Sequence, residues 1–308
     1  MDLGDPQQSV PFEAVACPVC LDPANAREVF DAGPRGRVVR CRRCSLGYVS
    51  PRPVSTIALY ENPAYFGQSD ATSEAGYLAY SEDSDVMRAY FAGVAHDLAE
   101  RVGRGHLIEI GAANGSFLRA ARDAGFDVQG IEPGDAAAEV ARASGLPVRT
   151  GTLDDPTIER GAWDVVVLLQ TVEHLPAPGA ALDRLHALLR PGGLLVMTTP
   201  NQHSWLARVM GRRWFEYKPP EHLFLFTPRT IAALLARAGF EAIEVSRDVH
   251  RYPPRWVLRR LARYVPITRP LVAVTEQLLP AALLDRALPI YYGSMRITAR
   301  RPDATPAP

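Results

Sequence analysis

The chain has 308 residues, 47% hydrophobic and 22% charged, a composition typical of a globular protein with one sizeable α/β core and a small appendage. Its 34 basic and 34 acidic residues cancel, which excludes a global field that would draw the protein to nucleic acid or to an anionic membrane. The N-terminus lacks the basic and apolar regions of a secretory signal, and no apolar run reaches the roughly 18 residues of a bilayer span. We therefore expect a cytoplasmic protein without structural disulfides.

All four cysteines lie in two Cys-x-x-Cys pairs, Cys17 with Cys20 and Cys41 with Cys44. Each pair offers two thiolates on one side of a tight turn, and two such turns complete a tetrahedral site. A redox pair would instead need one Cys-x-x-Cys at the start of a helix. The spacing predicts a zinc ribbon over residues 12–55 that holds a structural Zn²⁺. Its excess of arginines fits either contact with something anionic or a solvated surface.

A tyrosine-rich linker and a helical pattern follow over residues 56–104. Tyr77 and Tyr80 are three residues apart, so they share one face if the segment is helical. They are candidates to line a substrate site, and core packing is the alternative interpretation.

Strands alternate with helices over residues 105–300, and the apolar strands are typical of a parallel sheet covered on both faces. We expect an α/β fold with a doubly wound, Rossmann-like sheet and an antiparallel last strand. A late helix should begin with Thr227 as N-cap and Pro228 at its first position. The predicted strands are 106–111, 126–133, 147–151, 163–170, 194–201, 241–249 and 294–301, and the predicted helices are 116–125, 134–145, 177–193 and 227–240.

A basic helical insertion is expected at 251–290, before the last strand, and a disordered tail at 301–308. In the insertion, apolar residues such as Trp256 and Leu261 are interspersed with several arginines. Such an amphipathic helix fits a peripheral contact with a membrane surface or a lid over the active site. We favour the lid, with arginines available to an anionic acceptor, because the insertion leaves the sheet on the substrate side.

Ligands of such sheets bind beyond the carboxyl ends of the strands. The first strand ends in Glu109, followed by a turn with Gly111 and Gly115, and the next strand ends in Glu132. The turn is not a Gly-x-Gly-x-x-Gly dinucleotide site, and an acid at its start would repel phosphate and attract a cation. Glu132 could accept both hydroxyls of a ribose.

This arrangement resembles the class I S-adenosylmethionine-dependent methyltransferases over about residues 85–300. The resemblance implies that the first glycine turn surrounds the methionine part of the cofactor, that Glu132 binds the ribose, and that residues 151–154 meet the adenine. The cofactor-binding residues implied are Glu109, Gly111, Ala112, Asn114, Gly115, Phe117, Glu132, Thr152, Leu153 and Gln170.

The ribbon, the tyrosine linker and the segment PPEHLFLFT are similar to the bacterial branch that includes the deoxysugar C-methyltransferases. That resemblance implies a substrate site lined by Glu221, His222, Tyr77 and Tyr80. The chain lacks the long C-terminal domain of those sugar enzymes, so the acceptor need not be a sugar.

Methyl transfer from a sulfonium requires positioning, exclusion of water and, for a protonated nucleophile, a base. We expect His222 to be that base, with Glu221 orienting its ring and the following phenylalanines excluding water. His174 is a competing base, and Glu173, His174 and His222 together could bind a metal, as in some quinone-pathway O-methyltransferases that this region resembles. The sequence predicts methyl transfer to a hydroxyl or enolisable carbon of a small acceptor. The alternatives are an RNA methyltransferase that uses the basic ribbon and a non-catalytic cofactor-binding scaffold.

Overall fold

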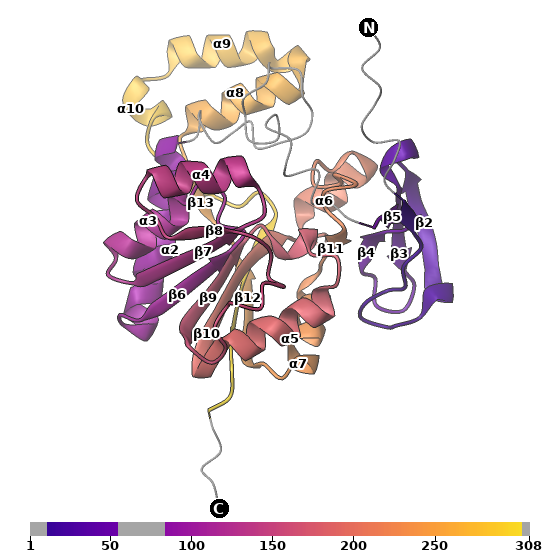
Figure 1. The fold of residues 1–308 in the computed structure, drawn as a ribbon. Coiled ribbons are helices and arrows are strands. Elements are labelled where there is room, and N and C mark those ends of the chain that lie inside the picture. The colour runs from indigo at the N-terminus through magenta and orange to yellow at the C-terminus, as the bar shows by residue number, and fades with distance from the viewer. Residues whose placement is uncertain (1–10, 55–83, 304–308) are drawn as a thin grey trace, which may run out of the picture.

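A seven-stranded sheet organises the chain in the computed structural model, which describes residues 11–54 and 84–303 (Figure 1). The strand order is β12-β15-β10-β9-β6-β7-β8, and only β15 runs antiparallel to its neighbours. This is the doubly wound sheet with an antiparallel last strand that the sequence predicts. The strands are β6 (His106–Ile110), β7 (Asp127–Glu132), β8 (Val148–Thr150), β9 (Trp163–Leu169), β10 (Leu189–Pro200), β12 (Glu241–Arg247) and β15 (Ser294–Arg300).

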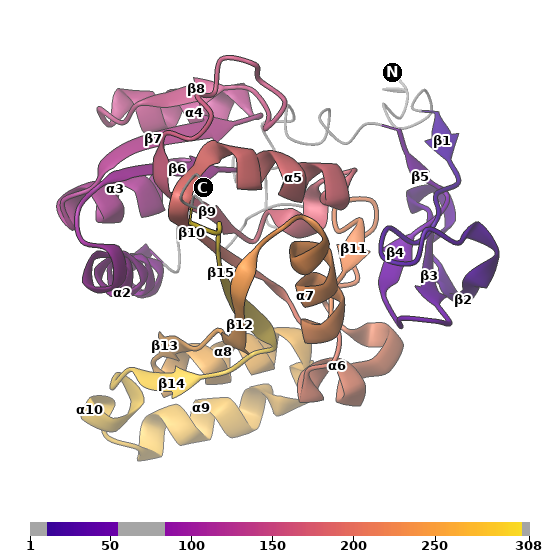
Figure 2. The same ribbon diagram turned by 90° about the horizontal axis from the view of Figure 1, so that it is seen from below.

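Helices cover both faces of this sheet (Figures 1 and 2). One face carries α2 (Ser84–Val102), α3 (Ser116–Asp123) and α4 (Asp135–Ala143), whose apolar side chains form a core with alternate residues of the central strands. The other face carries α5 (Pro178–Leu188) and α7 (Pro228–Arg237), and its core continues into the N-terminal cysteine region. Burial on both faces explains why the strands read as unbroken apolar runs.

Local signals set most element ends. Thr227 caps α7 because its Oγ1 accepts a hydrogen bond from Thr230 N, and Thr230 Oγ1 accepts one from Thr227 N in return. This is a capping box with Pro228 at the first helical position, as expected. The helix predicted over 177–193 ends earlier than expected, at Leu188. β10 already begins at Leu189, and its register against β9 shifts between Leu189 and Leu194. The Arg-Pro-Gly-Gly segment is therefore an irregular start of the strand.

The cysteine region forms a four-stranded sheet of order β11-β4-β3-β2. Three strands are local, β2 (Ala26–Asp31), β3 (Arg37–Cys41) and β4 (Gly47–Val49), with the short helices η2 (Pro23–Asn25) and η3 (Gly33–Arg35) at their turns. β1 (Phe12–Glu13) pairs with β5 (Arg52–Pro53). The fourth strand, β11 (Phe224–Leu225), comes from the PPEHLFLFT segment and pairs with β4 (Figure 2).

Short helices follow two of the central strands. η5 (Val172–His174) follows β9, and α6 (Trp205–Met210) and η6 (Gly211–Arg213) follow β10. The apolar run of PPEHLFLFT thus completes a sheet. Phe224 and Phe226, which the sequence predicts to exclude water from the transferring methyl group, lie in the core with 3% and 0% exposure and do not line the cavity described below. The sequence could not show this because the strand partner lies more than 175 residues away.

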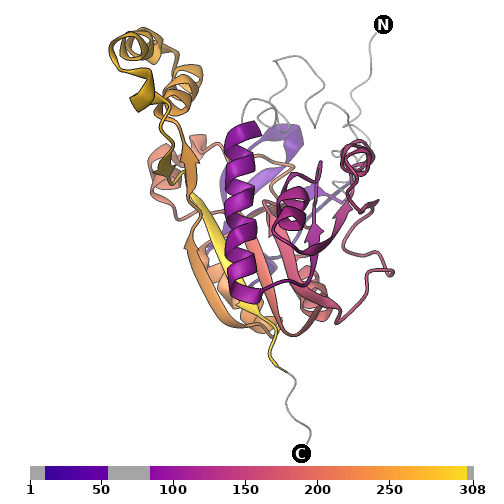
Figure 3. The same ribbon diagram turned by 90° about the vertical axis from the view of Figure 1, so that its left-hand side faces the viewer.

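The insertion rises from β12 and β15 on a two-stranded stalk, β13 (His250–Tyr252) and β14 (Leu288–Ile290), which the sequence did not reveal (Figure 3). It carries α8 (Pro254–Tyr264), η7 (Pro266–Thr268), α9 (Arg269–Leu278) and α10 (Ala281–Leu284). α8 packs on α9, and Trp256 stacks on Tyr252 with ring centroids 4.0 Å apart. Among the residues described, no helix combines the length and apolarity needed to cross a membrane. Both the lid and the membrane contact stay predictions.

Candidate active site

The turn after β6 brings backbone close to a cavity at the carboxyl edge of the sheet. Gly111 has φ +78°, and a Cβ there would lie 2.6 Å from Thr171 Oγ1, so only glycine fits. Gly115 has φ +76° and packs against Leu146, so its glycine is required by packing. Asn114 accepts hydrogen bonds from Ser116 N and Oγ at 3.2 and 2.7 Å at the start of α3. The turn is therefore shaped partly for a ligand and partly for its own helix.

Glu132 at the end of β7 is only 3% exposed. Its carboxylate accepts hydrogen bonds from Ala113 N and Gly134 N, both at 2.8 Å, which tie the turn after β6 to the turn after β7. Burial raises its pKa, and the two backbone donors oppose that rise. Each oxygen keeps a second lone pair, as the predicted bond to a ribose diol would need.

Glu109, also 3% exposed, has a carboxylate oxygen with no hydrogen-bond partner among the described residues. Burial first, and then the neighbouring Glu132, raises its pKa well above the usual range. A buried, unsatisfied acid that faces a cavity favours a bound cation, such as the ammonium or sulfonium of the expected cofactor.

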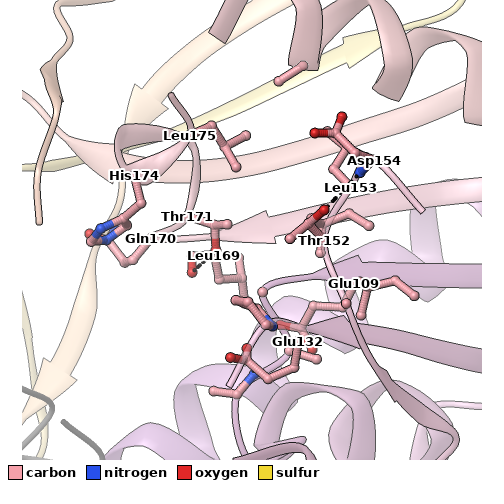
Figure 4. A pocket seen from close by; sticks show the side chains of 18 of the residues that line it. Glu109, Glu132, Thr152, Leu153, Asp154, Leu169, Gln170, Thr171, His174 and Leu175 are labelled. Atoms are coloured by element: carbon pink, nitrogen blue, oxygen red, sulfur yellow. Dashed lines mark hydrogen bonds between the residues drawn. The ribbon is translucent and has the colours of Figure 1, made fainter. Parts of the chain in front are cut away.

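A cavity of about 360 Å³ connects these acids to η5 (Figure 4). Of the predicted cofactor residues, all but Asn114 and Gly115 line it. Figure 4 shows Glu109, Glu132 and Thr152 toward one end and His174 at the other. Gln170 lies beside His174 with a left-handed backbone of φ +52°, held by a bond from its N to Thr198 O at 2.9 Å. Asp154, in the segment 151–154 that is expected to meet the adenine, also lines the cavity. Thr171 and Leu175 line it too, and no motif of the sequence indicated them as site residues.

Glu173, His174 and His222 form a cluster, called the Glu-His-His cluster below, whose ligand atoms lie within 4.8 Å of one another. His174 Nδ1 donates to Glu221 O at 2.9 Å, and His222 Nδ1 donates to Glu216 O at 3.0 Å. Burial lowers the pKa of His174 to about 4 and that of His222 well below its usual value, and it raises the pKa of Glu173 to about 8. All three groups are therefore uncharged near neutral pH.

The structure places the side chains of this cluster differently from what their predicted roles require. His174 lines the cavity, whereas His222 lies behind it with 6% exposure and a ring 4.8 Å from that of His174. The carboxylate near His222 Nδ1 is that of Glu216, at 3.6 Å, while Glu221 contributes its backbone carbonyl to His174. Tyr77 and Tyr80 lie outside the described residues.

The four cysteines gather at one point of the ribbon, called the tetracysteine site below. Their sulfur atoms lie within 4.8 Å of one another, with Cys17 to Cys44 at 3.5 Å and Cys20 to Cys41 at 3.8 Å. A tetrahedral zinc with bonds of about 2.3 Å requires sulfur separations of roughly 3.8 Å. The thiols are not in disulfides, and the donor set therefore fits zinc.

A doubly wound sheet with a glycine turn and two acids at adjacent strand ends defines the class I S-adenosylmethionine-dependent methyltransferase fold. Residues 83–245, more than half of the chain, match the methyltransferase domain family, and the chain belongs to that family.

Solved structures support the same fold. A SAM-dependent methyltransferase from Archaeoglobus fulgidus has a TM-score of 0.50 and 15% identity, covering 72% of this chain and 99% of its own. One from Thermotoga maritima has a TM-score of 0.50 and 19% identity, covering 73% and 94%. At these low identities, the similarity shows a shared fold and does not extend to a shared activity.

Curated relatives include ubiquinone biosynthesis O-methyltransferases. The protein of Pseudomonas aeruginosa is 30% identical over 152 residues, 45% of this chain and 66% of the relative, and that of Bordetella avium is 27% identical over 150 residues, 44% and 61%. The chain thus spans just under two thirds of these relatives.

At high pH, the cofactor-free Glu109→Gln variant should be more stable to unfolding than the cofactor-free wild type. The folded pKa of Glu109 lies above its unfolded value of about 4.3, so the folded state binds more protons between the two values and loses stability with rising pH, by up to about 1.4 kcal/mol per pH unit. Denaturation at pH 5 and pH 8 should show that the variant lacks this loss, while its affinity for S-adenosylmethionine falls at least tenfold. Equal pH slopes for variant and wild type would contradict the assignment.

Proposed function

We propose that the protein transfers the methyl group of S-adenosylmethionine to a hydroxyl or enolisable carbon of a small biosynthetic acceptor. The observation that carries this proposal is one cavity with Glu109 and Glu132 toward one end and His174 at the other. The first end suits a cation and a diol, and the second suits an acceptor that must lose a proton. The O-methyltransferase names of the curated relatives support an oxygen acceptor.

Attack on the sulfonium is an in-line displacement, in which the acceptor atom bonds to the methyl carbon as the carbon–sulfur bond breaks. The leaving thioether needs no acid, so the protein must position the partners and exclude water. Apolar side chains of Phe91, Ile110, Leu153, Leu169 and Leu175 line the cavity and serve that purpose.

We propose that the acceptor's proton passes to Nε2 of His174, the ring at the cavity wall, and that His222, the base predicted from the sequence, acts from behind it through the contact between the two rings. Each Nδ1 donates to a backbone carbonyl, which places the proton on Nδ1 and makes Nε2 the acceptor nitrogen of each ring. The lowered pKa values keep both rings in the base form at neutral pH.

A test uses methyl-labelled S-adenosylmethionine with hydroxylated aromatic acceptors and nucleotide-linked deoxysugars, and identifies products by mass. His222→Gln and His174→Gln should each lower transfer about 100- to 10,000-fold, as expected for loss of a general base. Affinity for S-adenosylhomocysteine should change less than threefold, because the cofactor acids are intact. His96→Gln, at a side chain with 73% exposure, is the matched control. Unchanged transfer in His222→Gln would remove His222 from the role.

One observation also favours a divalent metal at the same place. The Glu-His-His cluster is a two-histidine, one-carboxylate donor set, Glu173 Oε1 is buried without a partner among the described residues, and Thr199 Oγ1 donates to Oε2 at 2.9 Å. A cation held by these residues would supply Lewis-acid activation of an acceptor hydroxyl. Mn²⁺ added to protein that retains its tetracysteine zinc should give a bound paramagnetic signal that Glu173→Gln abolishes. A signal that survives in the variant would exclude this set.

We further propose that the tetracysteine site holds structural Zn²⁺. The support is the donor set and the sulfur separations, which fit four thiolates around one tetrahedral ion. Metal analysis of the purified protein should give about one zinc per chain.

A further inference from the structure

We infer that the tetracysteine site positions the Glu-His-His cluster, so that occupancy of the metal site controls the geometry at the proton-accepting end of the cavity. This inference rests on the function proposed above, because it gives a role to residues named there. It follows from a continuous set of hydrogen bonds between two regions that are distant in the sequence.

The first part of this connection runs from the second cysteine pair into β4. Cys41 N donates to Leu46 O at 2.9 Å, and Ser45 N donates to Cys41 O at 3.0 Å, which closes the cysteine turn directly onto the start of β4. β4 then pairs with β11, with Tyr48 opposite Phe224. Tyr48 is only 1% exposed, so this pairing is packed as well as hydrogen-bonded.

Leu223 joins β4 to the cluster. Its carbonyl accepts a hydrogen bond from Val49 N at 2.9 Å, and its own N–H donates to Glu173 O at 2.9 Å. Leu223 directly follows His222 in the chain and is fully buried. A displacement of β4 is therefore passed to the backbone of both His222 and Glu173 through a single residue.

Further contacts hold the ribbon against the same part of the sheet. Gly47 N donates to Gln202 Oε1 at 3.1 Å, and Arg237 Nη2 donates to Pro18 O at 2.9 Å, inside the first cysteine pair. Arg52 Nη1 donates to Pro176 O at 2.6 Å, two residues after His174. Glu132 at the cofactor end is instead held by the turns after β6 and β7.

The two ends of the cavity should therefore respond differently to the metal. Without it, the cysteine turns lose their common anchor and β4 loses its fixed position. The bonds from His222 Nδ1 to Glu216 O and from His174 Nδ1 to Glu221 O set the ring tautomers, and they depend on the backbone that Leu223 holds. The cofactor end should be retained.

The test uses the full chain labelled with ¹⁵N-histidine. Nuclear magnetic resonance follows the Nδ1–H signals of His174 and His222, assigned with the His→Gln variants, and calorimetry measures S-adenosylhomocysteine binding. Chelation of zinc should shift or broaden both signals, change the dissociation constant less than about threefold, and be reversed by added Zn²⁺. Unchanged histidine signals in zinc-free protein would overturn the inference, as would loss of sheet structure by circular dichroism, which would make the metal a general support of the fold.

A second variant leaves all four cysteines intact. In Gly47→Ala the new Cβ would lie 2.5 Å from Gln202 Nε2, so it displaces the Gln202 amide that accepts the hydrogen bond from Gly47 N at the start of β4. A Cβ at Gly93 on α2 meets nothing within 4 Å. Gly47→Ala should keep its zinc and shift the two histidine signals, and Gly93→Ala should change neither. A Gly47→Ala protein with zinc bound and wild-type histidine signals would contradict the coupling. Absence of cofactor binding in the wild type would overturn the proposed function, and the zinc-dependent histidine shift would still be measurable.

Discussion

Glu132→Ala should weaken binding of S-adenosylmethionine and S-adenosylhomocysteine at least 100-fold, equivalent to about 3 kcal/mol. The carboxylate holds Ala113 N and Gly134 N and is the predicted partner of the ribose hydroxyls. Its removal leaves two buried backbone donors without an acceptor and costs the cofactor its charge-assisted bonds. Calorimetric titration measures the effect directly.

Glu139→Ala is the matched control, because this acid is exposed on the adjacent helix α4 and should leave affinity unchanged. Glu132→Gln keeps the shape of the side chain, so its affinity for the cofactor should lie between that of Glu132→Ala and that of Glu139→Ala. Wild-type affinity in Glu132→Ala would mean that the cofactor binds elsewhere, and the two-acid assignment would be abandoned.

Asp248→Ala should lower the free energy of unfolding by about 3 to 5 kcal/mol, the usual cost of breaking a buried charge network. Asp248 is 1% exposed and accepts hydrogen bonds from Tyr90 OH at 2.9 Å and His250 Nε2 at 3.0 Å. Arg296 Nη2 lies 3.4 Å from the same carboxylate. This network joins α2, β15 and the stalk of the insertion, so its loss leaves several buried polar groups without a partner.

Asp97→Ala provides the comparison, since Asp97 pairs with the same Arg296 at 3.1 Å but is 51% exposed. An exposed pair contributes less than about 1 kcal/mol. Urea denaturation of both variants should therefore give well-separated midpoints with similar slopes. Similar midpoints for the two variants would show that the buried network is not a major source of stability.

Local sequence patterns were sufficient to predict the central sheet, because continuous apolar strands, glycine turns and helix caps act within a few residues. Glu109, Gly111 and Glu132 stand at strand ends, and the chain order of the strands already places such ends at one edge of a parallel sheet. The two cysteine pairs are similarly local, since each Cys-x-x-Cys defines its own turn. These features depend on spacing and not on distant partners.

The remaining site depends on contacts between distant segments. The sequence shows that PPEHLFLFT is apolar, but not that β11 pairs with β4, more than 175 residues earlier. It placed Glu221 beside His222 as neighbours in the chain, whereas the fold brings Glu216 to that ring and turns the Glu221 carbonyl toward His174. Adjacency in sequence does not determine which side chains meet.

By itself, the sequence determined the class of fold, the acids at the cofactor end and the cysteine set, because burial periodicity and turn chemistry are encoded locally. Only the tertiary structure decided that His174 lines the cavity with His222 behind it and that the ribbon shares a sheet with the segment carrying His222. The physical reason is that strand pairing and core packing select partners by shape and hydrogen bonding across the whole chain, and an apolar pattern specifies that a residue is buried but not against what.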